Sequence, residues 1–153
     1  MAKLDRNGVK IHYEIHGDGP TLLLSHGYSS TCRMWDGQIA ALKDRYKVVV
    51  WDFRGHGESD YPADPALYSE ALTVGDMLAL LDLVGAKKAI VAGLSLGGYM
   101  SLAFNASHPD RVSALMLFDT GPGFKKDEAR LKWNETAQKR AADFDARGLA
   151  ALN

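Results

Sequence analysis

The chain has 153 residues, of which 46% are hydrophobic and 24% are charged, and its formal net charge is −1. These values predict an ordinary globular protein with a real hydrophobic core. The charge balance, without a cluster of lysine and arginine, excludes nucleic acid and a membrane surface as expected partners. Because charged residues interrupt the first 16 positions and no apolar run could span a bilayer, we expect a cytoplasmic protein.

The first third of the chain alternates between predicted strands and polar turns. Residues 2–4 and 9–15 alternate in polarity, and Asn7-Gly8 between them is typical of an antiparallel hairpin. A continuous apolar run at 21–25 indicates a strand that is buried on both faces, and 46–52, with Val48-Val49-Val50-Trp51 at its centre, is expected to be the next buried strand. A helix is expected between these runs, with its apolar residues at helical spacing: Trp35, Ile39 and Leu42.

The second part of the chain continues this alternation. A helix is expected from Thr73, where Thr73 and Asp76 would form a capping box, to Gly85. A strand near 89–94, a helix ending at His108-Pro109, a strand over 112–119 and a charged helix over 127–147 follow. Strands that alternate with helices predict a doubly wound, mostly parallel sheet with a crevice at the carboxyl ends of its strands.

The most informative stretch is Gly93-Leu94-Ser95-Leu96-Gly97, which separates a predicted strand from a predicted helix. A serine nucleophile must project from a very tight turn, and glycine at the flanking positions leaves room for it. The helix amides there favour negative charge, and the N–H of Leu96 is placed to hold a developing oxyanion. We therefore predict that Ser95 is a catalytic nucleophile.

Three blocks in this order resemble the α/β-hydrolase family: His26-Gly27 with Trp35 eight residues later, the turn at 52–59, and the elbow at 93–98. The resemblance implies an α/β fold with a doubly wound, mostly parallel sheet, truncated after about the sixth strand. Residues 1–122 would form an incomplete core and residues 123–153 the start of a helical lid. The lid segment looks most like the enol-lactonase and cofactor-free haloperoxidase branch.

The resemblance also assigns roles to single residues. The N–H groups of Tyr28 and Leu96 would form the oxyanion hole, and Asp119 is a candidate for the catalytic acid. His26 and His56 would brace loops beside the site. The residues expected to bind substrate are Gly27, Tyr28 and Trp133, and those expected on the surface are His12, His16 and His108.

One departure from the family pattern limits these expectations. In the family, the acid and the histidine follow two further strands, and no histidine follows His108 here. We therefore expect an incomplete catalytic domain, and the sequence leaves open whether the protein ends at Asn153. Without those strands, the apolar run at 112–118 would be an exposed edge through which the chain could self-associate.

The predicted function is hydrolysis of a small carboxylic ester, thioester or lactone through an acyl-enzyme on Ser95. Carbon–carbon bond hydrolysis and cofactor-free haloperoxidation stay open, as does a non-catalytic fragment that binds a small apolar ligand or self-associates. A serine at the elbow argues against dehalogenases and epoxide hydrolases, which need a carboxylate there. We expect neither a cofactor nor a metal, because Cys32 is the only cysteine, the turn at 93–98 lacks the lysine of a phosphate loop, and the histidines and carboxylates do not suggest a ligand set. The identity of the substrate and the oligomeric state are not predicted.

Overall fold

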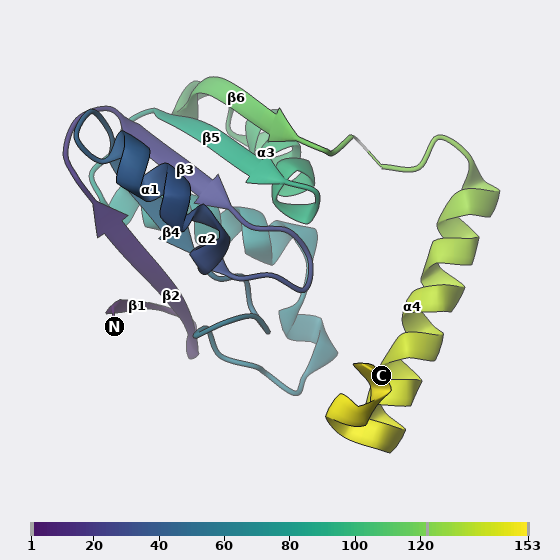
Figure 1. Cartoon of the computed structure of the whole chain (residues 1–153). Helices are drawn as coiled ribbons and strands as arrows, with labels where there is room; N and C mark the ends of the chain where they lie inside the picture. Colours follow the sequence, from purple (N-terminus) through teal and green to yellow (C-terminus); the bar gives the residue numbers. More distant parts are fainter. Residues whose placement is uncertain (1, 122, 153) are drawn as a thin grey trace. The chain divides into compact units, whose positions relative to one another are not determined.

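The computed structural model describes residues 2–121 and 123–152. The chain divides into two compact units, Met1–Gly121 and Pro122–Asn153 (Figure 1). Pro122, in the turn expected after the last strand, and Asn153 lie outside the described residues.

The first unit contains one six-stranded sheet in the order β1-β2-β4-β3-β5-β6. β1 pairs antiparallel with β2 and β2 with β4, whereas the pairs β3/β4, β3/β5 and β5/β6 are parallel. This confirms the predicted mostly parallel sheet with an antiparallel opening hairpin. The strands are β1 Ala2–Arg6, β2 Val9–His16, β3 Thr21–Ser25, β4 Lys47–Trp51, β5 Ala89–Leu94 and β6 Val112–Phe118.

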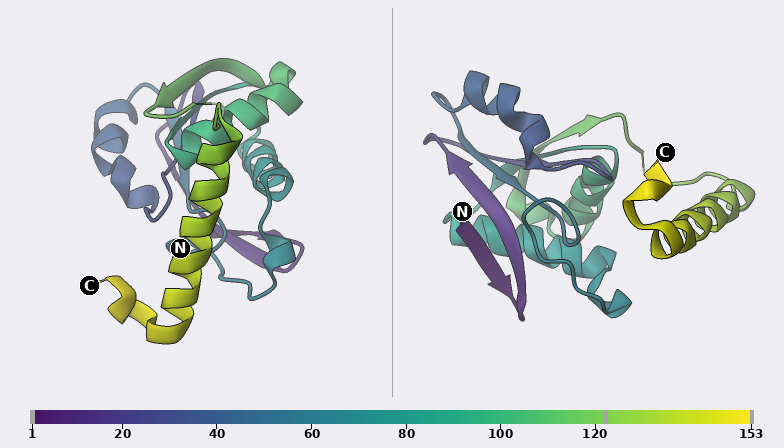
Figure 2. Two further views of the ribbon diagram at one scale, coloured as in Figure 1. Left: turned by 90° about the vertical axis from the view of Figure 1, so that its right-hand side faces the viewer. Right: turned by 60° about the horizontal axis from the view of Figure 1, so that its bottom comes forward.

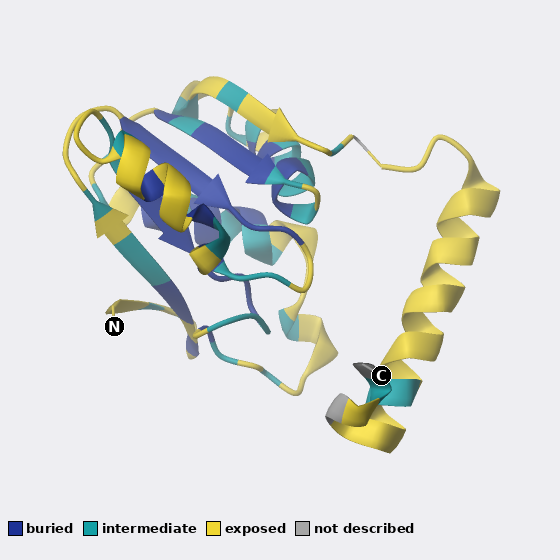
Figure 3. Cartoon of the chain, viewed as in Figure 1, coloured by how far each residue is buried: buried dark blue, intermediate teal, exposed yellow. Residues whose placement is uncertain are grey.

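Helices cover both faces of this sheet, with α1 on one side and α2 and α3 on the other (Figure 2). Alternate residues of β3 face these two layers. Leu22 and Leu24 pack with Trp35 and Ile39 of the α1 side, and Leu23 packs with the α2 and α3 side. The sheet is therefore doubly wound and buried at its centre (Figure 3). The helical elements are η1 Cys32–Trp35, α1 Asp36–Leu42, η2 Pro65–Leu67, α2 Glu70–Leu83, α3 Leu96–Ser107 and η3 Pro109–Arg111.

The start of α2 differs from the sequence prediction. The helix begins at Glu70, and the Ser69 hydroxyl caps it by accepting a hydrogen bond from the N–H of Leu72 at 3.2 Å. Thr73 lies inside the helix, where its hydroxyl donates to the carbonyl of Ser69. The predicted capping box of Thr73 and Asp76 was therefore wrong, and Asp76 instead faces the interior with no exposed surface.

The prediction that His12 lies on the surface was also wrong, because its side chain is only 1% exposed. Its backbone N–H donates to the hydroxyl of Ser59, so the turn after β4 lies over this part of β2. His16 and His108 are half-buried. The His108 ring stacks on Phe104 with a centroid distance of 5.2 Å.

β6 lies at one edge of the sheet, and among the described residues no strand pairs with its outer side. Three of its large apolar side chains are about 40% exposed: Met116, Leu117 and Phe118. Unpaired backbone groups beside apolar side chains favour strand addition. Self-association through this edge stays a prediction.

The second unit consists of α4 (Asp127–Arg147) followed by the short helix η4 (Gly148–Leu152). α4 has no buried residue among those described, and it carries ion pairs one turn apart, such as Asp127 with Arg130 at 2.9 Å. The rings of Phe124 and Trp133 lie 6.0 Å apart. None of the described helices is long and apolar enough to cross a bilayer.

Candidate active site

Ser95 is the single residue between β5 and α3, and its backbone has φ 51° and ψ −112°. A positive φ is strained for any residue with a Cβ, and such strain concentrates at functional sites. Hydrogen bonds fix the residue on both sides: its N–H donates to Phe118 at 2.9 Å, and its carbonyl accepts from Tyr99 at 3.0 Å. The side chain is exposed, so the structure has the sharp strand-to-helix turn that the sequence predicts.

The glycines of this turn allow very close backbone contacts. A Cβ on Gly93 would lie 2.2 Å from the carbonyl carbon of Gly97. A Cβ on Gly97 would lie 2.2 Å from the carbonyl oxygen of Ser25, at the end of β3. The start of α3 is therefore pressed against the segment that leads from β3 into the next loop.

We expect Gly97→Ala to lower the free energy of unfolding by about 2–3 kcal/mol, because the added methyl group overlaps a backbone oxygen that cannot rotate away. Gly37→Ala is the matched control, since a Cβ on Gly37 in α1 would meet nothing within 4 Å. The free energy of unfolding of that variant should rise by about 0.5–1 kcal/mol, because alanine restricts the conformations of the unfolded chain. Urea unfolding followed by circular dichroism measures both values, and equal effects would contradict the close packing.

The loop after β3 begins with His26, which is fully buried. Its Nδ1–H donates to the carbonyl of Gly27 at 2.7 Å, and its Nε2 accepts from the N–H of Phe53 at 3.1 Å. These two bonds assign the neutral tautomer with the proton on Nδ1. Burial lowers the pKa of His26 below its ordinary value. The ring therefore joins the loops after β3 and β4 only while it is uncharged.

The free energy of unfolding should fall as the pH drops below about 6.5, the ordinary histidine pKa. His26 has the lower pKa in the folded state, so below that pH the unfolded chain binds more protons at this position, and stability rises with pH. Urea unfolding at a series of pH values measures the slope. His26→Gln should flatten it, and an unchanged slope in that variant would exclude His26 as its source.

Gly27 and Tyr28 follow His26 and lie beside the elbow. A Cβ on Gly27 would be 3.7 Å from the Cβ of Ser95. The Tyr28 ring is 58% exposed and lies 6.0 Å from the ring of His56, which is 5.1 Å from the ring of His26. Leu96 is the first residue of α3, where N–H groups have no acceptor within the helix. Gly27 and Leu96 thus lie next to Ser95, and the role of the Tyr28 and Leu96 N–H groups as oxyanion donors stays a prediction.

Asp119 directly follows β6 and is exposed, with φ 46°. Both of its neighbours contact the elbow: the carbonyl of Phe118 accepts from the N–H of Ser95, and the hydroxyl of Thr120 donates to the carbonyl of Ser95 at 2.7 Å. The structure therefore places the backbone of Asp119 beside Ser95. Trp133, predicted to bind substrate, belongs to the second unit, where it packs with Phe124.

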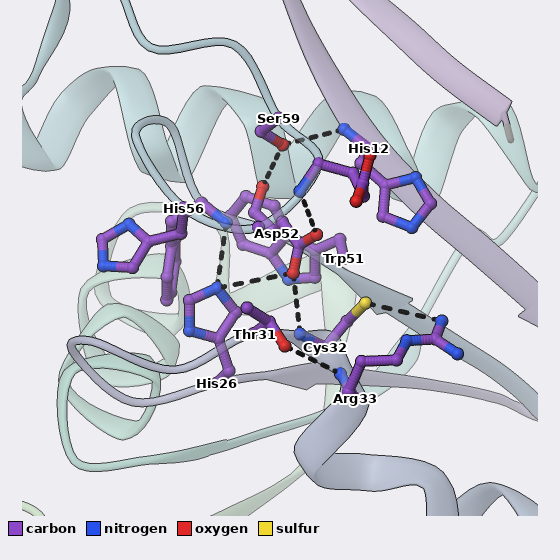
Figure 4. Close-up of polar contacts among 12 residues, drawn as sticks. His12, His26, Thr31, Cys32, Arg33, Trp51, Asp52, His56 and Ser59 are labelled. Carbon is purple, nitrogen blue, oxygen red and sulfur yellow. Dashed lines mark hydrogen bonds and ion pairs between the residues drawn. The ribbon is translucent and has the colours of Figure 1, made fainter.

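Asp52 connects the loops around the site, a role that the sequence did not reveal (Figure 4). Its buried carboxylate accepts from the N–H of Cys32 at 2.7 Å and from the N–H of Glu58 at 2.9 Å. A Cβ on Gly57 would lie 2.2 Å from this carboxylate, so the turn needs glycine there. The sequence feature that could have indicated this role is the position of Asp52, a carboxylate between an apolar strand and a glycine-rich turn.

Among the described residues, no hydrogen bond is formed by the hydroxyl of Ser95. The arrangement thus holds an exposed serine at a strained turn, at the N-terminus of α3 and beside Gly27 of the loop after β3. Such a site can position a nucleophile and stabilise negative charge on a carbonyl oxygen. Activation of the hydroxyl needs a general base in addition.

Comparisons with known proteins agree with this geometry. A sequence model of the family described as alpha/beta hydrolase fold matches residues 20–152. "Epoxide hydrolase 3" of Siraitia grosvenorii is 34% identical over 114 residues, which are 74% of this chain and 36% of that protein. The chain thus spans about a third of the length of this curated relative.

Two solved structures are similar over nearly the whole chain. A hydrolase from Pseudomonas aeruginosa PA01 has a TM-score of 0.85 at 31% identity, covering 99% of this chain and 55% of that one. The enol-lactonase from Burkholderia xenovorans LB400 has a TM-score of 0.83 at 32% identity, with coverages of 99% and 56%. The family match, the doubly wound sheet and the strand-to-helix turn at Ser95 agree, and the chain belongs to the α/β-hydrolase family.

Proposed function

We propose that the protein is a serine hydrolase that acts on a small carboxylic ester, thioester or lactone. The Oγ of Ser95 attacks the carbonyl carbon while its proton passes to a general base. The bond to the alcohol or thiol then breaks, that group takes up the proton, and the acyl group stays on Ser95 as an ester. Water then releases the acid and restores the hydroxyl. The observation that supports this most is the positive φ of Ser95 at an exposed turn between β5 and α3.

The oxyanion of the tetrahedral intermediate would be held by the N–H groups of Leu96 and Tyr28. Leu96 brings a backbone donor at the positive end of α3. Tyr28 brings a second donor from the loop that Gly97 lets approach the elbow. Because the charge appears only after attack, these donors stabilise the transition state more than the substrate.

The chemistry of the elbow residue favours acyl transfer over epoxide opening. The curated relative named above is an epoxide hydrolase, and one structural neighbour is an enol-lactonase. Opening an epoxide through a covalent ester needs a carboxylate nucleophile, whereas a serine hydroxyl forms an ester with an acyl group. The serine at position 95 therefore favours a substrate with a reactive carbonyl.

A direct comparison of substrates tests this proposal. The protein as its natural source makes it would be assayed with p-nitrophenyl butyrate, an enol lactone, an acyl thioester and styrene oxide. We expect turnover of at least one carbonyl substrate and no hydrolysis of the epoxide. Epoxide hydrolysis without any ester, thioester or lactone hydrolysis would contradict the proposed function.

A further inference from the structure

A cluster of metal-ligating side chains lies between β2 and η1, apart from the elbow. His12, Glu14 and His16 alternate along β2, so they share one face of the strand. The Nε2 of His12 is 3.3 Å and that of His16 is 2.9 Å from the Glu14 carboxylate. One ligand atom from each of His12, Glu14 and Cys32 lies within 4.8 Å of the others.

Two members of this cluster are deeply buried. The side chains of His12 and Cys32 are each 1% exposed. The Nδ1 of His12 has no hydrogen-bond partner among the described residues. A buried polar atom without a partner is costly and calls for an explanation, such as an ion or a water molecule at the site. The other ring nitrogen, Nε2, is the one that lies 3.3 Å from Glu14, so the ring turns one nitrogen toward the cluster and leaves the other without a partner among the described residues.

A positive charge already occupies the rim of the cluster. The Nη2 of Arg33 contacts the carboxylate of Glu14. It also lies 3.7 Å from the sulfur of Cys32 (Figure 4). Arg33 is 55% exposed, and its Nη1 is 3.5 Å from the carboxylate of Asp36. The guanidinium can therefore leave Glu14 and keep a carboxylate partner. The Glu14 carboxylate thus attracts a cation, and another cation can replace the Arg33 guanidinium there.

We propose that His12, Glu14 and Cys32 form a binding site for a zinc ion. Imidazole nitrogen, thiolate sulfur and carboxylate oxygen are the ligands that zinc prefers, whereas calcium and magnesium prefer oxygen alone. As the zinc–sulfur bond forms, the thiol proton of Cys32 leaves to solvent. Water or the imidazole of His16, beside Glu14, completes four ligands.

This proposal revises the expectation that the chain holds no metal. The sequence does contain a His-x-x-x-His spacing, in His12 and His16, with Glu14 between them. On a strand, alternate residues share a face, and Cys32 joins them from η1. The N–H of Cys32 also donates to Asp52, which holds the turn at 52–58. Zinc would therefore fasten β2 to this network and act structurally.

Zinc binding can be measured without any enzyme assay. The purified protein, freed of metal, would be titrated with zinc chloride in a calorimeter, and cobalt would be added separately to detect thiolate-to-cobalt absorption. We expect one ion per chain, a higher melting temperature with zinc, and the cobalt band. Cys32→Ser and Glu14→Gln should each weaken zinc binding roughly 100-fold.

Three further variants complete the design: Arg33→Ala, His16→Ala and His108→Ala. Arg33→Ala should tighten zinc binding by about tenfold, because it removes a competing positive charge. His108→Ala, at the end of α3, should leave the affinity for zinc unchanged. Circular dichroism without metal checks that each variant is folded. The proposed zinc site is contradicted if the protein binds no zinc, or if Cys32→Ser keeps both the zinc affinity and the cobalt band. It is also contradicted if His16→Ala is the one variant that abolishes zinc binding.

Discussion

Replacing Ser95 with alanine should reduce ester or lactone hydrolysis by roughly 10⁴-fold or more, because the nucleophile of a serine hydrolase acts as a unit with its base. Alanine keeps the Cβ, so the strained backbone at φ 51° should be retained. The hydrogen bonds that fix the turn come from the backbone of Ser95 and should survive. Steady-state kinetics gives the loss, and urea unfolding shows whether stability is unchanged.

A fluorophosphonate probe sharpens this test, since it forms a bond only with an activated serine. Intact mass should increase by one adduct in the natural protein and not in Ser95→Ala. Ser107→Ala is the matched control, because Ser107 ends the same helix and its hydroxyl contacts only that end of the chain: it donates to the carbonyls of Ala103 and Phe104 and lies 3.0 Å from Nδ1 of His108 among the described residues. Full activity in Ser95→Ala, or labelling at another serine, would remove Ser95 from the proposed mechanism.

The sequence predicted those parts of the fold that depend on local patterns. The stretches 21–25 and 46–52, each with an apolar centre, became β3 and β4, because a strand buried on both faces needs apolar side chains on each of them. The turn at Ser95 was predictable for a similar reason. Strand, flanking glycines and helix all lie within one short segment, so the requirement for close approach is local.

The sequence failed where a polar side chain is buried by partners distant along the chain. His12 looks like an exposed residue of a hairpin, yet its N–H is bonded to Ser59, 47 positions later. Asp76 looks like the third position of a capping box, yet its partner Arg54 lies 22 positions earlier. Hydropathy periodicity records which side of an element is apolar, and it does not record which charges are matched across the fold.

The buried pair of Arg54 and Asp76 provides the second large effect. Arg54 donates from Nε and Nη2 to the two carboxylate oxygens at 2.7 and 2.9 Å, and the side chains are 5% and 0% exposed. This contact raises the pKa of Arg54, so the guanidinium stays charged. Asp76→Ala would leave that charge buried without its partner, and we expect the free energy of unfolding to fall by about 3–5 kcal/mol.

Asp82→Ala is the matched control for Asp76→Ala, because it removes an aspartate of the same helix that also pairs with an arginine. The Asp82 side chain is 60% exposed, and its contact with Arg111 at 2.7 Å should contribute less than about 1 kcal/mol. Urea unfolding of both variants separates burial from pairing. Asp76 also accepts from Nε of Arg6 at 3.1 Å, but the Arg6 side chain is 30% exposed and water can reach it. The double variant Arg54→Met/Asp76→Leu should be more stable than Asp76→Ala, because it removes the buried Arg54 charge together with Asp76. Equal losses in Asp76→Ala and Asp82→Ala would mean that the buried pair does not hold the turn at 52–60 against α2.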